Sequence, residues 1–129
     1  MTTISGLATE QKKAEILQIA KKARRYLKIP KSVKIHIALG ILTDCGEINR
    51  LGNNHFQIWV DKTLTRGMTA EVIGHECQHI CQFLDKRLQI INNLLYFDGI
   101  CMTSVPYKDR PFEIEAKEIG RKLKKMLAK

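Results

Sequence analysis

The segment TAEVIGHECQHICQFLDK, residues 69–86 of this 129-residue chain, is the part of the sequence around which the remainder can be arranged. With about 100° of rotation per residue, a helix over this segment carries His75 and His79 on one side and apolar residues on the other. Thr69 is suited to cap its beginning. We therefore expect a helix that packs on a core and turns both histidines towards a cleft. Its apolar side consists of Ile73, Cys77, Ile80, Cys81 and Leu84.

His75, Glu76 and His79 fit the pattern His-Glu-x-x-His. Residues i and i+4 lie one above the other on a helix, so two imidazoles can bind one Zn²⁺ ion. Glu76 is displaced by about 100°, which sets its carboxylate beside the open coordination position. There it can take a proton from water and pass it to a leaving group. Two surface histidines on an ordinary helix are the alternative, because short patterns also arise by chance.

Four cysteines are present, and two of them, Cys77 and Cys81, have the i, i+4 spacing of a possible metal site. They lie among the apolar residues of the helix, where a free cysteine behaves as a small buried side chain. We predict core packing for this pair. Cys45 and Cys101 have no ligand spacing, so packing is the expectation for them too.

Upstream of the helix, residues 33–39, 47–51 and 55–60 have the patterns of strands, and residues 9–27 have the pattern of a helix that ends before Pro30. Downstream, Asp98-Gly99 lies between two apolar runs and predicts a hairpin. Pro111 opens a last helix, which runs to the C-terminus. The order helix, small antiparallel sheet, helix, hairpin, helix predicts an α+β fold in one domain over residues 1–129.

The chain carries a net charge of +9, and its basic residues cluster in residues 21–28 and 121–129. Such clusters could contact nucleic acid or an acidic partner, although the solvated faces of two amphipathic helices are the simpler explanation. No apolar run approaches the roughly 20 residues of a membrane helix. The N-terminus does not resemble a signal peptide. We therefore expect a cytoplasmic protein with free thiols; the oligomeric state is left open.

A catalytic zinc ion normally has three protein ligands and one open position. The extended pattern HExxHxxGxxH is absent, because Gln82 replaces its glycine and Asp85 its third histidine. In the last helix, Glu115 lies at the edge of an apolar stripe, and Glu113 lies on a side that looks solvated. A buried carboxylate needs a partner, either a metal or a basic side chain. Glu115 is thus the predicted third ligand, with Glu113 as the alternative.

The run YKDRPFEIEA, residues 107–116, resembles the Y-x-x-R-P-x-E-x-E-A signature of small, often phage-encoded HExxH metallopeptidases of the minigluzincin type. The resemblance covers about residues 55–120. It implies a minimal zincin-like domain, and a phage-like protein could act in a virus-infected host cell. Ile119 occupies the position where larger gluzincins often have an aspartate that orients a histidine, so that partner must come from elsewhere.

This resemblance implies one zinc ion held by His75, His79 and Glu115, with Glu76 as general base. Zincin-type enzymes usually bind a peptide as an added strand along the sheet edge nearest the metal. The strand 55–60 directly precedes the metal-binding helix and is the predicted edge. Its outer face would present His55, Gln57 and Trp59, either to a substrate or as ordinary exposed residues.

Tyr107 could donate a hydrogen bond to a developing oxyanion, or it could pack at the entrance of the last helix. The sequence as a whole predicts a zinc metallopeptidase that acts on a peptide or protein substrate. Another zinc hydrolase, such as an amidase or deformylase, would need a cysteine ligand, and Cys45 is the upstream candidate. A non-enzymatic basic binding protein with a structural zinc is the third possibility; an intact Glu76 argues against it.

Overall fold

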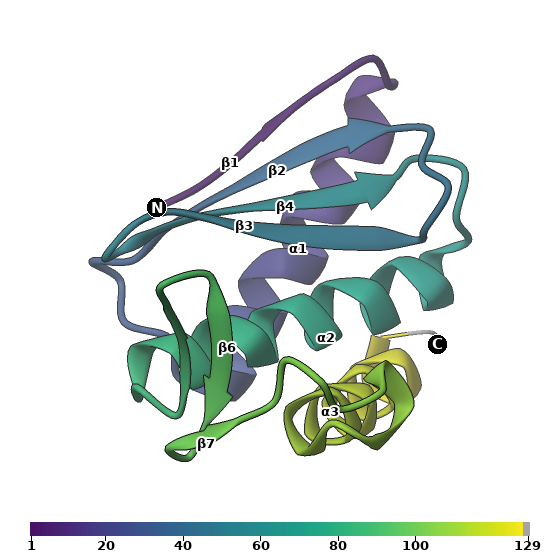
Figure 1. The fold of residues 1–129 in the computed structure, drawn as a ribbon. Helices are drawn as coiled ribbons and strands as arrows, with labels where there is room; N and C mark the ends of the chain where they lie inside the picture. The colour runs from purple at the N-terminus through teal and green to yellow at the C-terminus, as the bar shows by residue number, and fades with distance from the viewer. Residues whose placement is uncertain (128–129) are drawn as a thin grey trace.

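The computed structural model describes residues 1–127 and contains a four-stranded sheet in the order β1–β2–β4–β3 (Figure 1). β1 and β2 are parallel, as are β2 and β4, and β3 is antiparallel to β4. Parallel neighbours need a long crossover, and helix α1 supplies it between β1 and β2. The strands span Thr2–Ser5 (β1), Lys34–Gly40 (β2), Gly46–Gly52 (β3) and His55–Asp61 (β4).

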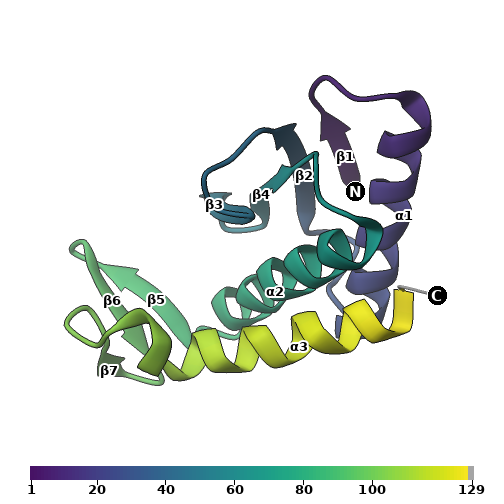
Figure 2. The same cartoon turned by 90° about the vertical axis from the view of Figure 1, so that its right-hand side faces the viewer.

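Three α-helices accompany this sheet, together with a short 3₁₀ turn that precedes the last of them. Helices α1 and α2 lie on the same face of the sheet, and α3 runs alongside α2 (Figures 1 and 2). The predicted α+β class is therefore confirmed. The bounds are Glu10–Leu27 (α1), Arg66–Leu84 (α2), Tyr107–Asp109 (η1) and Pro111–Leu127 (α3).

The core lies between the sheet and helices α1 and α2, and it extends to α3 through Phe112, Leu123 and Leu127. Alternate residues of β2 and β4 point into it, which confirms the predicted alternation. The predicted apolar sides of α1 and α2 meet them there, and Cys77 is among the buried residues. The central members are Ile16, Ala20, Ala23, Ile35, Ile37, Phe56, Ile58, Val60, Ile73, Cys77 and Ile80.

Helix α2 begins one turn earlier than predicted. Thr65 is the N-cap, and its side chain accepts a hydrogen bond from the Met68 backbone amide at 3.3 Å. Thr69 lies within the helix and donates to the Thr65 carbonyl oxygen at 2.8 Å. Both threonines fit a cap in sequence, and only the path of the chain after β4 distinguishes them.

A second sheet of three antiparallel strands projects beside the end of α2 (Figure 2). The predicted hairpin at Asp98-Gly99 is present and joins β6 to β7. The pattern reading missed the other hairpin, in which Asn92 and Asn93 form the turn with positive φ angles of 52° and 65°. Asparagine tolerates this conformation better than most residues. The strands are Leu88–Ile91 (β5), Leu94–Phe97 (β6) and Ile100–Cys101 (β7).

Two expectations about the main sheet are wrong. The sheet is mixed and not simply antiparallel, because β2 and β4 pair in parallel and β1, which the sequence did not reveal, adds a further parallel strand. The predicted edge strand, residues 55–60, lies in the interior as β4, and the edge strand beside it is β3. Pairing order depends on how the connections cross the sheet, and alternation within one strand carries no information about its neighbours.

The four cysteines divide into two pairs. Cys77 is buried and Cys81 is half-buried, as predicted, and burial raises the pKa of both thiols. Cys45 and Cys101 are exposed, so the prediction of packing for them is wrong. Cys45 precedes the edge strand β3, and Cys101 ends the two-residue strand β7, so neither belongs to an element that the core encloses. Within residues 1–127, no helix is both long and apolar enough to span a membrane.

Candidate metal and catalytic site

Helix α2 carries His75, Glu76 and His79, and their side chains form one cluster in which Glu76 and His79 are buried. One potential ligand atom from each of the three lies within 4.8 Å of the others. The Nε2 atoms of the two imidazoles are 3.2 Å apart. This cluster could hold a metal ion, as the spacing of its residues predicts.

Glu113, at the start of α3, completes the cluster. Its Oε1 atom lies 3.0 Å from Nε2 of His75 and 3.0 Å from Nε2 of His79. Its place on the helical projection suggested a solvated side chain. That expectation is wrong, because Glu113 is only 8% exposed. The two histidines hold the pKa of its carboxyl far below the ordinary value against the opposing effect of burial. Glu113 is therefore an ionised carboxylate directed at both imidazoles.

Glu115, the predicted third ligand, is not placed with the histidines. Its carboxylate accepts two hydrogen bonds from Arg87, at 3.0 and 3.1 Å, and others from Gln78 and Gln82, at 2.6 and 3.1 Å. These donors hold its pKa below the ordinary value, although burial opposes them. The alternative that the sequence reading left open for Glu115, an ion pair with a basic side chain, is the one found.

The position of Glu113 beside the histidines, and of Glu115 away from them, has a simple geometric cause. Residues two positions apart on a helix, such as Glu113 and Glu115, differ by about 200° of rotation. Only one of these glutamates can therefore face the histidines. The prediction of Glu115 assumed that the apolar stripe of α3 faces the site. The site instead adjoins that stripe, and the carboxylate of Glu115 turns towards Arg87 at the beginning of the second sheet.

Gln82, one turn after His79, is a site residue that the pattern reading did not identify. Its Oε1 atom accepts a hydrogen bond from Nδ1 of His79 at 2.8 Å. Its amide nitrogen donates to the Phe112 carbonyl oxygen and to Glu115, which fixes the direction of the amide. His79 therefore carries a proton on Nδ1, and in its neutral form Nε2 presents a lone pair to Glu113. The sequence shows only that Gln82 follows His79 by one helical turn; its burial and its partners come from the fold.

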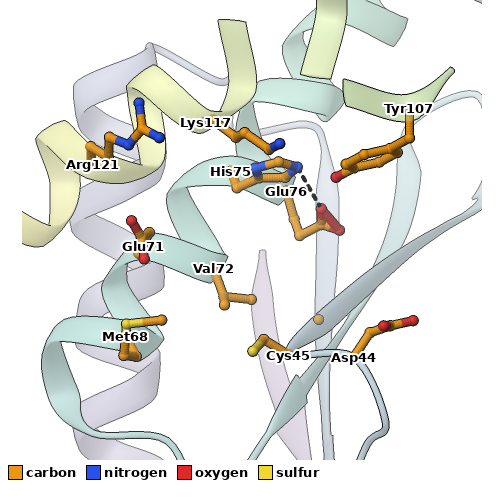
Figure 3. Close-up of a pocket in the computed structure, with 11 residues that line it drawn as sticks. Asp44, Cys45, Met68, Glu71, Val72, His75, Glu76, Tyr107, Lys117 and Arg121 are labelled. Carbon is orange, nitrogen blue, oxygen red and sulfur yellow. Dashed lines mark ion pairs between the residues drawn. The ribbon is translucent and has the colours of Figure 1, made fainter. Parts of the chain in front are cut away.

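Glu76 lies beside His75, with Oε1 3.7 Å from Nε2 of that residue (Figure 3). It is 6% exposed, and burial raises the pKa of its carboxyl above the ordinary value, against the opposing charges of the two histidines. A carboxylate with a raised pKa accepts a proton more readily near neutral pH. Its position and its pKa suit a general base.

An open cavity of about 680 Å³ adjoins the cluster (Figure 3). His75, Glu76 and Tyr107 lie on one side of it, and Cys45 and Gly46, where β3 begins, lie on another. Residues of α2 and α3 form the other walls. The cavity is large enough for one or two side chains of a bound molecule. Its other lining residues are Asp44, Met68, Glu71, Val72, Lys117 and Arg121.

Tyr107, the predicted donor to an oxyanion, is at the mouth of this cavity and is 51% exposed. Partial burial, followed by the nearby carboxylates of Glu113 and Glu76, raises the pKa of its hydroxyl to about 12. The hydroxyl therefore stays protonated at neutral pH and is available as a donor. The Lys117 ammonium group lies 5.0 Å from the centre of the Tyr107 ring.

Three residues proposed for substrate contact, His55, Gln57 and Trp59, lie on β4 between two other strands. All three are half-buried, and none of them is among the residues that line the cavity beside the cluster. The structure therefore does not bring them together with His75 and Glu76.

Comparisons with protein-family models, with curated proteins and with solved structures find no match to this chain. What can be said of its chemistry thus rests on two observations from the chain itself. One is the cluster of His75, Glu76 and His79 on α2, and the other is the contact of Glu113 with both histidines.

Proposed function

We propose that this chain is a zinc-dependent metallopeptidase in which His75, His79 and Glu113 hold one Zn²⁺ ion and Glu76 is the general base. The observation that carries the proposal is the meeting of one carboxylate oxygen with two imidazole nitrogens, 3.0 Å from each. The resemblance of residues 107–116 to minigluzincin-type enzymes supports it, with the ligand role moved from Glu115 to Glu113.

The three proposed ligand atoms fit a tetrahedral zinc ion. Ligands about 2.0–2.2 Å from zinc in tetrahedral geometry lie about 3.3–3.6 Å from one another. The corresponding separations here are 3.0, 3.0 and 3.2 Å, so a small outward shift of each side chain would accommodate the ion. Two nitrogens, one carboxylate oxygen and an open cavity on the fourth side are typical of a catalytic site and not of a closed structural one.

The tautomer of His79 is a further argument for a cation. Because Nδ1 donates to Gln82, the lone pair of Nε2 faces the ionised carboxylate of Glu113 at 3.0 Å. Two acceptors at that distance repel each other unless a cation, either a proton or a metal ion, lies between them. Burial opposes a charge on the imidazole, while Glu113 favours it and raises the pKa of His79 overall. A divalent ion would satisfy both histidines and Glu113 at once.

When bound, zinc would polarise the scissile carbonyl group and lower the pKa of a water molecule to about 7. Side chains of the protein would supply proton transfer and a hydrogen bond to the substrate. The Glu76 carboxylate takes a proton from the attacking water and delivers it to the amide nitrogen that leaves. The protonated hydroxyl of Tyr107 donates to the oxygen on which negative charge develops.

The edge strand β3 supports a peptide as the substrate. β3 begins at Gly46, which lines the cavity beside Glu76. Its outer edge has no neighbouring strand within the described part of the chain. An extended peptide could add to this edge through backbone hydrogen bonds and pass the cluster with a side chain in the cavity. The proposed peptide site is thus the edge of β3, whereas the sequence alone suggested the strand of residues 55–60.

The first test of the proposal is Glu76→Gln, assayed with a quenched-fluorescent peptide library and zinc-loaded protein. Without its base, the variant should bind zinc like the parent and lose hydrolysis by about 10²- to 10⁴-fold. Glu118→Gln, at an exposed position of α3, is the control and should keep full activity. Hydrolysis by Glu76→Gln at the rate of the parent would show that the mechanism is wrong.

The second test compares Glu113→Gln with Glu115→Gln, because both remove one carboxylate from the same turn of α3. Zinc affinity is measured by competition with a chromophoric chelator. Glu113→Gln should weaken zinc binding at least 100-fold, since it removes a ligand, whereas Glu115→Gln should change it less than about tenfold. The reverse ranking would restore Glu115 as the ligand and contradict the assignment made here.

A further inference from the structure

A second cavity, of about 640 Å³, lies at the C-terminal end of α1. It has no lining residue in common with the cavity beside the metal cluster. The last turns of α1, the loop that follows and the beginning of β1 form its walls. Its lining residues are Met1, Thr2, Lys21, Arg24, Arg25, Lys28, Ile29, Pro30 and Lys31.

Five of these nine side chains are basic and none is acidic. Lys21, Arg25, Lys28 and Lys31 are exposed, and none of them pairs with a carboxylate of residues 1–127. The cavity beside the metal cluster is different, because it has acidic and basic residues on its walls. The second cavity therefore has a positive potential that the described residues do not neutralise, and a concave shape concentrates such a potential.

Arg24 forms a rigid part of this wall. It is 8% exposed. Its guanidinium group donates to the carbonyl oxygens of Pro30 and Val33, at 2.7 Å each. It also donates to the Met1 carbonyl oxygen and to the Thr2 hydroxyl, at 3.1 Å each. All four acceptors are neutral. The contacts tie β1 and the loop after α1 to the helix, while the positive charge of Arg24 remains uncompensated beside the cavity.

The dipole of α1 accounts for part of this arrangement only. Arg24 and Arg25 lie in the last turn of the helix, where basic residues are favourable. The effect falls off within one turn, and Lys21 and Lys31 lie outside it. Those two lysines make no side-chain hydrogen bond within the described part of the chain, so no contact in the fold explains why they are basic.

We propose that this cavity binds the phosphate backbone of a nucleic acid. Five cations around one cavity exceed what a single anion requires, and they suit a polyanion with regularly spaced charges. The wall has no Asn, Gln, acidic or aromatic side chain to read a base, Met1, Ile29 and Pro30 are apolar, and the Thr2 hydroxyl already accepts a hydrogen bond from Arg24. Binding should therefore be independent of base sequence. The net charge of +9 would also speed the encounter with such a partner.

The experiment measures the fluorescence anisotropy of a short, labelled single-stranded oligonucleotide of mixed sequence over a series of salt concentrations. The test variant combines Lys21→Gln, Arg25→Gln and Lys31→Gln, which remove three charges from the cavity and break no side-chain hydrogen bond or ion pair among residues 1–127. Affinity should fall about tenfold or more. The slope of log affinity against log salt should fall by about 2, since each single-strand phosphate contact contributes about 0.7.

The matched control combines Lys108→Gln, Lys122→Gln and Lys125→Gln, which remove three exposed charges outside the cavity. It should keep the affinity within about twofold. Equal losses in both triple variants would show that binding follows net charge alone and would overturn the proposal, as would the absence of binding by the parent chain at low salt.

Polyglutamate of comparable charge is the competitor that tests the chemical class of the ligand. If it displaces the labelled strand as effectively as an unlabelled oligonucleotide does, the site recognises acidic peptides and the proposal is wrong. The test does not depend on the peptidase proposal, because Glu76→Gln should bind the oligonucleotide like the parent.

Discussion

At the scale of single residues, the decisive arrangement is the chain of hydrogen bonds that leads away from His79. Gln82 accepts from His79 and donates to Glu115, which in turn is held by Arg87. This series of hydrogen bonds fixes the His79 imidazole in the tautomer that leaves Nε2 free for a metal. If His79 is a zinc ligand, as proposed, Gln82 orients it in place of the aspartate that the gluzincin resemblance leads one to expect at Ile119.

Gln82→Met tests this arrangement, because methionine is similar in size and cannot accept from Nδ1 of His79. Zinc affinity, again measured by chelator competition, should fall about 10- to 100-fold. Gln78→Met is the matched control, since the Gln78 side chain donates to Glu115 and makes no hydrogen bond with the His79 imidazole. If both variants bind zinc equally well, Gln82 does not orient the ligand.

At the scale of elements, the close approach of α3 to α2 brings Glu113 to the histidines. Two glycines permit it. A Cβ atom on Gly120 would lie 2.6 Å from the carbonyl oxygen of Glu71, and one on Gly74 would lie 3.0 Å from the side chain of Leu123. Contacts under 3.0 Å require that something moves, and at Gly120 the neighbour is backbone. The distance between the two helices therefore depends on the absence of a side chain at Gly120.

Gly120→Ala should push α3 away from α2 and lower the free energy of unfolding by about 1–3 kcal/mol, as measured in urea. Because Glu113 is on the same helix, zinc affinity should fall in the same variant. Glu118→Ala, an exposed change on α3, should alter stability by less than about 0.5 kcal/mol. Unchanged stability and zinc binding in Gly120→Ala would mean that the helices adjust freely, and the proposed role of the glycine would be refuted.

At the scale of the whole molecule, most of the core lies between the main sheet and helices α1 and α2, and the candidate metal cluster adjoins it at one place. That place is Phe112, a core residue of α3 whose ring centre lies 6.0 Å from that of His79. A chain of 129 residues can bury well over half of its surface without a metal. The fold should thus persist without zinc, while the cluster, with its converging charges, should be stabilised by the ion.

Removal of zinc with a chelator should therefore leave the far-ultraviolet circular dichroism spectrum intact at 25 °C and lower the melting temperature. A free zinc concentration 100 times the dissociation constant stabilises the folded state by about 2.7 kcal/mol. This corresponds to a shift of roughly 10 °C for a chain of this size. Glu113→Gln should lose most of this shift. A parent chain that melts at the same temperature with and without zinc would contradict the site.

Much of this arrangement follows from local periodicity. The 3.6-residue repeat places His75, Glu76 and His79 on one helix and separates them from an apolar side, and alternation identifies β2 and β4. These features depend on residues near one another in the chain, so the sequence is sufficient to predict them.

Tertiary packing decided the rest. Periodicity says which residues share a face, but not which neighbour that face meets. The choice of Glu113 over Glu115 depends on how α3 lies against α2 at Gly120, and the choice of β3 over β4 as the edge depends on how distant strands pair. Gln82 has its role only because Phe112 and Glu115 come to it from another helix. Each of these contacts joins segments far apart in the chain, where no local pattern can register it.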